Sequence, residues 1–231
     1  ELYSDFNSMT ETLQKTEEQR RRFVSDASHE LKTPLTALNA VLENMILGIG
    51  KYRDYETYLP ECKEMTEQLS DMVREILETS KLGSPMKSEA LAETDLSLFL
   101  LPLCEPYEQI AKARGLIFRL DLSAGFCAVL PQRMFGKAVS NILANAVAYT
   151  KEGGTISLCF RKSDLIIENE CMPIPAEALP HVFEPFYRPD YARNREDGGN
   201  GLGLYIVDIL SKALELPYQF EASENPPGMC F

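Results

Sequence analysis

The stretch from residue 31 to residue 49 reads LKTPLTALNAVLENMILGI, and the spacing of its apolar residues decides the fold of the first third of the chain. Its apolar stripe consists of Leu31, Leu35, Leu38, Leu42, Met45 and Ile49, at alternating steps of four and three. A second stripe repeats these steps further along, at Tyr58, Cys62, Met65, Leu69, Met72 and Ile76. Such steps place all members of a stripe on one face of an α-helix.

Gly48-Ile49-Gly50-Lys51 lies between the stripes and predicts a turn, so residues 1–82 are expected to form a helical hairpin. Two helices cover only part of each stripe, and two copies of the hairpin would complete a four-helix bundle. We therefore expect a homodimer. The alternative is a monomer whose stripes pack on the rest of the chain.

The helical pattern ends at Gly83-Ser84-Pro85, which marks a linker. Beyond it, alternating runs predict strands at 116–122, 155–160 and 165–168, the last two joined by a turn at 162–164. Helical patterns follow at 96–113, 132–149 and 202–214. The second part is therefore expected to be an α+β sandwich of one mixed sheet and about three helices. A stretch at 188–200, rich in charge, glycine and asparagine, is predicted to be a mobile loop.

The composition excludes several classes of function. The chain has 231 residues, with 23 Lys and Arg against 35 Asp and Glu, and a net charge of -12, which argues against binding nucleic acid. No apolar run reaches the ~18 residues of a membrane span. The six cysteines are scattered and are expected to be reduced thiols in the cytosol, and two histidines are too few for a zinc site.

One of the two histidines, His29, lies just before the first stripe, in Ser28-His29-Glu30-Leu31. Extending the stripe backward gives Ser28, so His29 flanks the apolar face and is expected to be accessible. Its imidazole could attack an electrophile while the neighbouring carboxylate of Glu30 accepts the ring proton. Taken alone, such a pair is more often a solvated surface.

Two further motifs point to nucleotide phosphates. Asn141 and Asn145 are four residues apart, so both amides lie on one helical face, and amide oxygens suit Mg²⁺. Gly199, Gly201 and Gly203 lead into an apolar helical run, where backbone amides at a helix N-terminus can bind an anion. The glycine motif is neither a P-loop nor a clear Rossmann motif, because no Lys-Ser/Thr follows it and no strand precedes it.

In this order, the motifs resemble those of the cytoplasmic core of a sensor histidine kinase of a two-component system. The boxes of that family correspond to His29–Pro34 (H-box), 141–150 (N-box), 183–188 (F-box) and 199–204 (G2-box). The resemblance covers about residues 20 to 225. It implies a dimeric helical hairpin that carries the phospho-acceptor histidine, followed by a Bergerat-type ATP-binding α/β sandwich. Residues 1–19 resemble the end of a HAMP linker or signalling helix, 20–83 the dimerisation and phosphotransfer hairpin, and 84–231 the catalytic ATP-binding domain.

The resemblance also assigns roles to single residues. His29 would attack the γ-phosphate of ATP, Glu30 would orient or deprotonate its ring, and Thr33 would position the water that hydrolyses the phosphorylated partner. Asn145 would bind Mg²⁺. The residues that resemble the family's nucleotide-binding positions are Asn141, Asn145, Tyr149, Asn169, Arg188, Gly199, Gly201, Leu202 and Gly203.

The chain departs from the family at the G1-box, where an Asp usually accepts a hydrogen bond from the adenine amino group. Asn169 stands at that position, and Cys171 and Pro173 replace the two glycines. We expect a stiffer loop and weaker nucleotide binding. Asn in place of the G1 Asp makes the chain similar to a subgroup that includes the vancomycin-resistance sensors.

The expected function is ATP-dependent phosphorylation of His29, then transfer to an aspartate of a response regulator's receiver domain, with phosphatase activity as a possible reverse step. The alternatives are a phosphatase-dominant sensor and a non-catalytic dimeric interaction module with a degenerate nucleotide site. By this resemblance the fragment would be cytoplasmic, and the full protein would lie in the cell membrane through an upstream segment absent from this sequence.

Overall fold

The computed structural model describes residues 2–82, 89–123, 126–162, 164–189, 199–224 and 226–231. The chain divides into two compact units, Glu1–Ser80 and Lys81–Phe231, which are described separately below. The predicted linker at Gly83-Ser84-Pro85 and most of the predicted loop at 188–200 lie outside the described residues. In the part of the chain that is described, no helix has the length and apolar character needed to cross a membrane.

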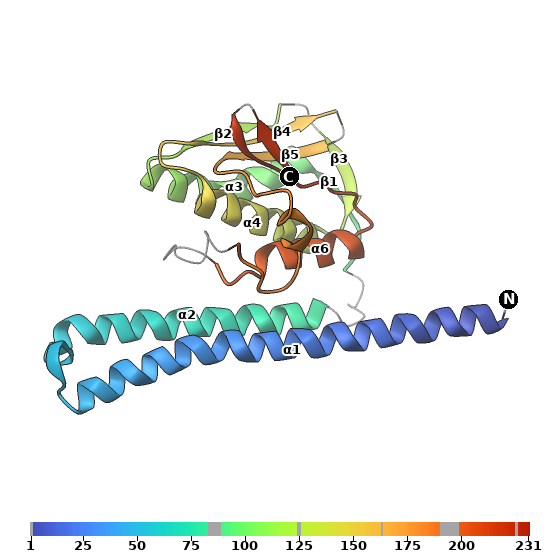
Figure 1. Cartoon of the computed structure of the whole chain (residues 1–231). Helices are drawn as coiled ribbons and strands as arrows, with labels where there is room; N and C mark the ends of the chain where they lie inside the picture. Colours follow the sequence, from blue (N-terminus) through green and yellow to red (C-terminus); the bar gives the residue numbers. More distant parts are fainter. Residues whose placement is uncertain (1, 83–88, 124–125, 163, 190–198, 225) are drawn as a thin grey trace. The chain divides into compact units, whose positions relative to one another are not determined.

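The first unit is a hairpin of two long helices, α1 (Leu2–Ile46) and α2 (Tyr55–Leu82), joined through a short 3-10 helix, η1 (Gly50–Arg53). The helices run side by side (Figure 1). The turn forms where the sequence predicts it, because Gly48 and Gly50 take φ values of +61° and +52° that other residues avoid. Asp54 then caps α2: its Oδ1 accepts a hydrogen bond from the Thr57 amide at 3.3 Å.

The hairpin buries few side chains. Among its described residues the buried ones are Phe23, Ala27, Met45, Cys62 and Thr79. Cys62 Sγ and Met45 Sδ, one from each helix, lie 4.0 Å apart. Most other members of the two predicted stripes are half-buried, whereas Leu35 and Ile49 remain 48% and 50% exposed. A single hairpin therefore leaves much of its apolar surface in water.

The second unit is built on a five-stranded mixed sheet with the strand order β2-β4-β5-β7-β6. β2 pairs parallel with β4, and the other three pairings are antiparallel. The bounds of the strands are β2 (Ile117–Asp121), β4 (Thr155–Arg161), β5 (Asp164–Glu170), β6 (Glu221–Glu224) and β7 (Pro227–Cys230). A separate antiparallel pair is formed by β1 (Ala92–Asp95) and β3 (Cys127–Leu130).

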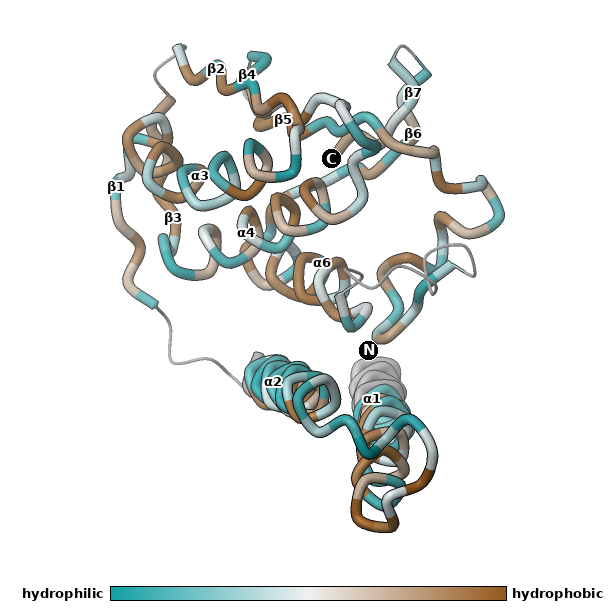
Figure 2. Tube along the Cα trace, turned by 90° about the vertical axis from the view of Figure 1, so that its left-hand side faces the viewer, coloured by the Kyte–Doolittle hydropathy of each residue, from teal (hydrophilic) through white to brown (hydrophobic). Residues whose placement is uncertain are grey.

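Helices α3 (Leu96–Ala113), α4 (Gln132–Tyr149) and α6 (Gly203–Ala213) lie on one side of the sheet (Figures 1 and 2), and a short 3-10 helix, η2 (Leu179–His181), precedes the F-box. Alternation along β4 explains this layering. Ile156 and Leu158 are fully buried, while Thr155 and Ser157 on the other face are half-buried. The core contains Leu100 and Leu143 from the helices and Leu158 from the sheet.

The α+β fold expected from the sequence, helices first and an α/β sandwich after them, is confirmed. The predicted helices agree with α3, α4 and α6 to within a residue or two, and the predicted hairpin agrees with β4 and β5. The strands predicted from the sequence do not include β1, β3 and β6. Each has four residues, and β1 and β6 read AETD and EASE, which carry no apolar alternation.

Candidate functional site

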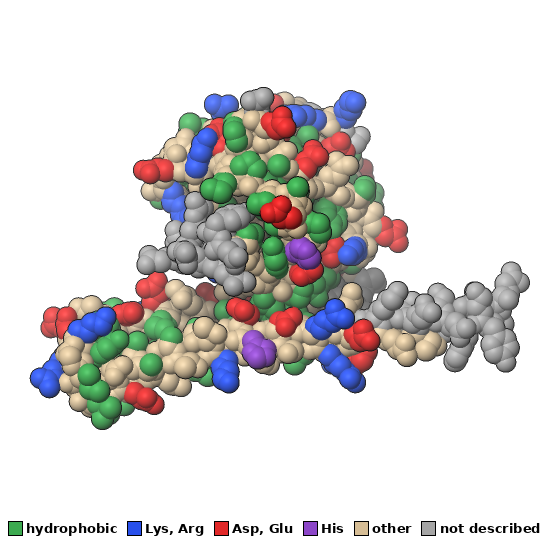
Figure 3. Space-filling model, viewed as in Figure 1, with side chains coloured by type: hydrophobic (Ala, Val, Ile, Leu, Met, Phe, Trp, Pro, Cys, Tyr) green, Lys and Arg blue, Asp and Glu red, His purple; other side chains and the backbone are tan. Residues whose placement is uncertain are grey.

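The H-box residues lie on α1. His29, Glu30 and Thr33 are all exposed, and Figure 3 shows a histidine at the surface of the helical unit. Ala27 is buried, and a residue two positions further along a helix points to nearly the opposite side, so His29 faces outward. The Thr33 hydroxyl donates a hydrogen bond to the His29 carbonyl oxygen at 3.4 Å. The two side chains thus follow one another on neighbouring turns of α1.

Two helices of the second unit bring Asn141, Asn145 and Gly203 together. α4 packs against α6, and a Cβ atom placed on Gly203 would lie 3.4 Å from both amide atoms of Asn145 and 3.6 Å from Asn141 Oδ1. The Asn141 amide nitrogen donates a hydrogen bond to the Lys137 carbonyl oxygen at 2.8 Å. This bond leaves Oδ1 as the atom that faces Gly203. The side-chain amides of both asparagines therefore lie against the first turn of α6.

The F-box and the G2-box meet at Phe186 and Gly201. The Phe186 amide donates a hydrogen bond to the Gly201 carbonyl oxygen at 3.0 Å. Gly201 has φ +73°, and a Cβ there would lie 2.7 Å from the Phe186 carbonyl carbon. Only glycine fits this close approach. Gly199, in contrast, has no neighbouring atom within 4 Å of its added Cβ, and Leu202 is fully buried, so its side chain belongs to the core.

Opposite α6, the end of α4 meets β5. Tyr149 is half-buried at the last residue of α4, and Asn169 of β5 donates a hydrogen bond from Nδ2 to Thr150 Oγ1 at 3.3 Å. Gly228 of β7 pairs beside Asn169, where a Cβ would collide with the Asn169 carbonyl oxygen. Neither Thr150 nor Gly228 was singled out as a site residue from the sequence. No local signal in the sequence marks the second, because its contact with Asn169 joins strands that are distant in the chain.

A salt bridge fixes the segment that follows α4. Lys151 Nζ lies 3.0 Å from Glu170 Oε2, and the Lys151 amide donates to the Glu170 carbonyl oxygen at 2.9 Å. The hydrogen bond from Lys151 holds the pKa of the Glu170 carboxyl below its ordinary value. The two contacts hold Lys151, which follows Thr150, against Glu170, which follows Asn169.

An aromatic cluster also packs against the F-box. The Phe183 ring packs edge-on against Tyr218 and Phe220, at centroid distances of 5.3 and 5.9 Å. The Tyr218 hydroxyl donates to the buried carboxylate of Asp208 on α6, which also pairs with Lys212 at 2.8 Å. Burial and Asp208 raise the pKa of Tyr218. α6 and the F-box are therefore tied together at both the Gly201 end and the Tyr218 end.

The residues present fit Mg²⁺ and nucleotide phosphates. Asn141 and Asn145 supply hard amide oxygens, and Gly203, which has no side chain, lets both amides approach the first turn of an eleven-residue helix. Arg188, half-buried, is the last residue of the F-box. In the described part of the chain, no cluster of three His, Cys, Asp or Glu residues offers a different metal site. His29 belongs to the first unit, and the candidate nucleotide-binding residues belong to the second.

Together these features define a phosphotransfer hairpin followed by an ATPase sandwich. Residues 19–85 match the His Kinase A (phospho-acceptor) domain family, and residues 131–231 match the family of histidine kinase-, DNA gyrase B- and HSP90-like ATPases. The chain therefore belongs to the sensor histidine kinases of two-component systems.

Curated relatives agree with this family. The chain is 30% identical to the sensor histidine protein kinase HK06 of Streptococcus pneumoniae over 227 residues, which cover 98% of this chain and 50% of that protein. It is 35% identical to the sensor protein VanSB of Enterococcus faecalis over 213 residues, which cover 90% of this chain and 48% of that protein. The chain thus spans about half the length of the curated relatives it matches.

Solved histidine kinases share the fold. The histidine kinase AdeS of Acinetobacter baumannii matches with a TM-score of 0.67 at 22% identity, over 87% of this chain and 94% of that one. The histidine kinase ThkA, solved in complex with the response regulator protein TrrA, matches with a TM-score of 0.65 at 18% identity, over 95% of this chain and 64% of that one.

Proposed function

We propose that this chain is an ATP-dependent protein-histidine kinase that phosphorylates His29 and passes the phosphoryl group to an aspartate of a response regulator. The observation that carries the proposal is the convergence of Asn141 and Asn145 on Gly203 at the start of α6. An exposed His29 beside Glu30 supplies the acceptor on the other unit.

Each candidate site residue has a separate proposed role in phosphoryl transfer. Glu30 orients the His29 ring and takes its proton as the ring nitrogen becomes the nucleophile. Asn145 and Asn141 would hold Mg²⁺, which when bound neutralises charge on the phosphates. The backbone amides that open α6 and the guanidinium of Arg188 would face phosphate oxygens, and Asn169 offers an amide carbonyl to the adenine amino group.

The nucleotide site is proposed to include Gly199, Gly201 and Tyr149, with Leu202 acting through the core. Gly201 lets the F-box approach, and Tyr149 stands at the end of α4 beside the Asn169–Thr150 hydrogen bond. Cys171 and Pro173 follow β5 and stand where the family has two glycines, so the loop is stiffer. This supports a nucleotide affinity below that of a site with glycines at both positions.

A second copy of the chain is the proposed partner of the hairpin. Val24, Leu35 and Ile46 are exposed and follow one another at steps of eleven residues, close to three helical turns, so they share one face of α1. Leu59, Val73 and Leu77 are exposed on α2. A four-helix bundle made from two hairpins would bury such faces, as the phospho-acceptor domain family implies.

The response regulator is proposed as the second partner, supported by the solved complex of ThkA with its regulator TrrA. Because the matched relatives are about twice as long as this chain, the sensor input and membrane attachment are proposed to reside in an upstream part of the whole protein. By the same reasoning, residues 1–19 would connect that part to the hairpin, and this fragment would face the cytoplasm.

A phosphatase activity on the regulator is the second candidate. It is favoured by Thr33, whose exposed hydroxyl follows His29 on the next turn, and by the departures at Asn169 and Pro173. In this candidate Thr33 would position the water that attacks the regulator's phosphoaspartate.

Incubation of the chain with γ-labelled ATP and Mg²⁺ tests the kinase. We expect label that is acid-labile and base-stable, that is lost in His29→Ala and in Asn145→Ala, and that is retained in His181→Ala, the matched control at the other histidine. Absence of label from the wild-type protein while it still binds nucleotide would contradict the kinase.

Dephosphorylation of a phosphorylated regulator tests the phosphatase. We expect Thr33→Ala to slow it and Thr36→Ala to leave it unchanged, since Thr36 is an exposed hydroxyl on the same helix that donates to the Lys32 carbonyl oxygen at 2.8 Å. Equal effects of the two substitutions would count against a role for Thr33.

A further inference from the structure

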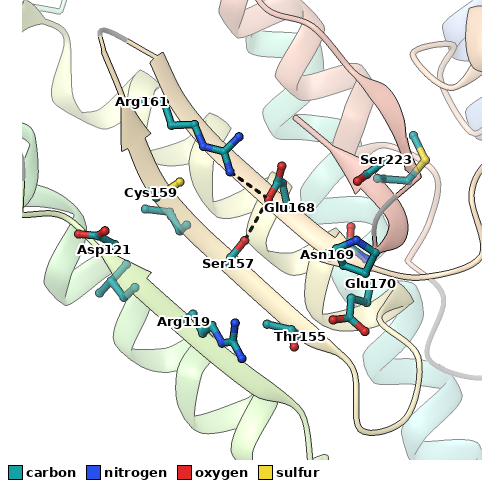
Figure 4. Close-up of a pocket in the computed structure, with 14 residues that line it drawn as sticks. Arg119, Asp121, Thr155, Ser157, Cys159, Arg161, Glu168, Asn169, Glu170 and Ser223 are labelled. Carbon is teal, nitrogen blue, oxygen red and sulfur yellow. Dashed lines mark hydrogen bonds and ion pairs between the residues drawn. The ribbon is translucent and has the colours of Figure 1, made fainter.

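The face of the sheet that is turned away from the helices carries a groove of about 370 Å³. Along β4, Ile156 and Leu158 point to the core, so Thr155 and Ser157 point into this groove. Its other polar lining residues are Arg161 of β4 and residues of β2, β5 and β6 (Figure 4). The groove is thus separated from the candidate nucleotide site by the thickness of the sheet.

Strand register places Arg119 and Glu168 on opposite sides of the groove. Asp121, which also lines the groove, lies two residues after Arg119 on β2 and accepts hydrogen bonds from Ser123. Arg119 of β2 pairs with Ser157 of β4, and Ser157 pairs with Glu168 of β5. Neighbouring strands are about 4.8 Å apart, so the backbones of Arg119 and Glu168 are roughly 10 Å apart with a hydroxyl between them. Figure 4 shows Arg119 on the β2 side of Thr155 and Glu170 on the other side.

The two carboxylates on β5 are less exposed than their basic partners. Glu168 and Glu170 have side chains that are 32% and 22% exposed, whereas those of Arg161 and Lys151 are 65% and 54% exposed. Arg161 approaches Glu168 only to 3.8 Å, and Ser157 Oγ donates to Glu168 at 3.5 Å. Ion pairs this long and this exposed contribute little, so an incoming cation can replace Arg161.

We propose that this groove binds a small zwitterion of amino-acid or dipeptide size. The carboxylate of the ligand would accept two parallel hydrogen bonds from the Arg119 guanidinium, and its ammonium would donate to Glu168, with Glu170 close by. The hydroxyls of Thr155 and Ser157, between the two charged ends, meet the polar middle of the ligand.

Other ligand classes fit less well. The carboxylates of Glu168 and Glu170 repel phosphate groups, and an apolar molecule would cover the charged groups of Arg119 and Glu168 without giving them a polar partner. A nucleotide would therefore not enter here. Along β5, Glu168 and Glu170 face the groove while Asn169, between them, faces the helices and binds Thr150. The zwitterion and the nucleotide would occupy opposite faces of one strand.

Binding of a panel of free amino acids and glycine-containing dipeptides, measured by ligand-observed NMR and calorimetry on the whole chain, tests this site. We expect at least one zwitterion to bind, and its N-acetylated and C-amidated forms to bind at least tenfold more weakly, because each lacks one charged end. Arg119→Gln and Glu168→Gln should each weaken binding at least tenfold. The matched controls Arg133→Gln and Glu177→Gln, at exposed positions outside the groove, should not.

Arg119 is exposed on an edge strand, so Arg119→Gln is expected to keep the fold, and an unchanged circular dichroism spectrum verifies this. Three results would each overturn the proposal: no zwitterion binding up to about 10 mM, unchanged binding in folded Arg119→Gln, or displacement of the zwitterion by a non-hydrolysable ATP analogue. None of these measurements requires phosphorylation, so their outcome is independent of the kinase test.

Discussion

The helical unit and the sandwich unit satisfy their apolar residues in different ways. The sandwich buries residues such as Leu100, Leu143, Ile156 and Leu158 completely within one chain. The hairpin buries only five described residues and leaves leucines and valines of both helices exposed. The sandwich therefore has a core of its own, whereas the stability of the hairpin is expected to depend on a second copy and hence on protein concentration.

The two units also present their chemistry differently. The H-box is a local feature, since His29, Glu30 and Thr33 lie within two turns of one exposed helix. The candidate nucleotide site is assembled from α4, β5, the F-box and the start of α6. Its integrity depends on close approaches such as that of Gly201 to Phe186. Substitutions in the sandwich should therefore affect stability and nucleotide binding together. Substitutions in the hairpin should affect either the chemistry of His29 or the assembly on which the stability of the hairpin depends.

Leu158→Ala should have the largest effect on stability. Leu158 is fully buried between the sheet and the helices, and removing its side chain there costs about 3 kcal/mol of unfolding free energy. Denaturant unfolding followed by circular dichroism measures it. Ile117→Ala, on the exposed side of β2, is the matched control and should cost much less. A loss for Leu158→Ala that changes with protein concentration would contradict a self-sufficient core.

Gly201→Ala should rank next. An alanine at this position would have to keep φ near +73°, and its Cβ would press on the Phe186 backbone. We expect this to cost about 2 kcal/mol of unfolding free energy. The resulting shift of the backbone should weaken binding of an ATP analogue at least tenfold. Gly199→Ala is the control, because its Cβ has open space around it. If both substitutions weaken binding equally, the joint between the F-box and the G2-box does not shape the site.

Local sequence patterns predict most of the helices, the central β-hairpin and part of the candidate site. The four-and-three spacing of apolar residues predicts α1 and α2, and Gly48 and Gly50 predict the turn, because helix periodicity and glycine geometry act over a few residues. The interval from Asn141 to Asn145 predicts one helical face for the same reason. The alternation on either side of residue 163 predicts β4 and β5.

Non-local features could not be read in this way. β1 and β6 are polar four-residue strands that exist because they pair with β3 and β7. The contact of Gly201 with Phe186 and the close approach of Gly228 to Asn169 join segments that are distant in the chain. The groove on the open face depends on strand register, which sequence alternation does not specify between distant strands.

Leu35→Glu tests the hairpin side of the comparison. Leu35 is exposed on the same face of α1 as Val24 and Ile46, and a charge there should weaken self-association at least tenfold, about 1.4 kcal/mol. Sedimentation equilibrium measures it. Leu98→Glu, at an exposed leucine of the sandwich, is the control and should leave association unchanged. A wild-type chain that is monomeric at micromolar concentration would contradict the bundle.

Lys151→Gln should have the smallest effect, and that effect should depend on pH. The hydrogen bond from Lys151 lowers the pKa of Glu170 in the folded protein below its ordinary value of 4.5. A carboxyl with a lowered folded pKa stabilises the protein above its unfolded pKa, and this contribution is lost as the pH falls through the folded value. The thermal midpoint of Lys151→Gln should therefore lie slightly below that of the wild type at neutral pH. The difference should shrink below about pH 4.5 and should vanish in the Glu170→Gln background. A difference that stays constant down to about pH 3 would mean that Lys151 acts through packing of its side chain against the end of α4 and not through its charge.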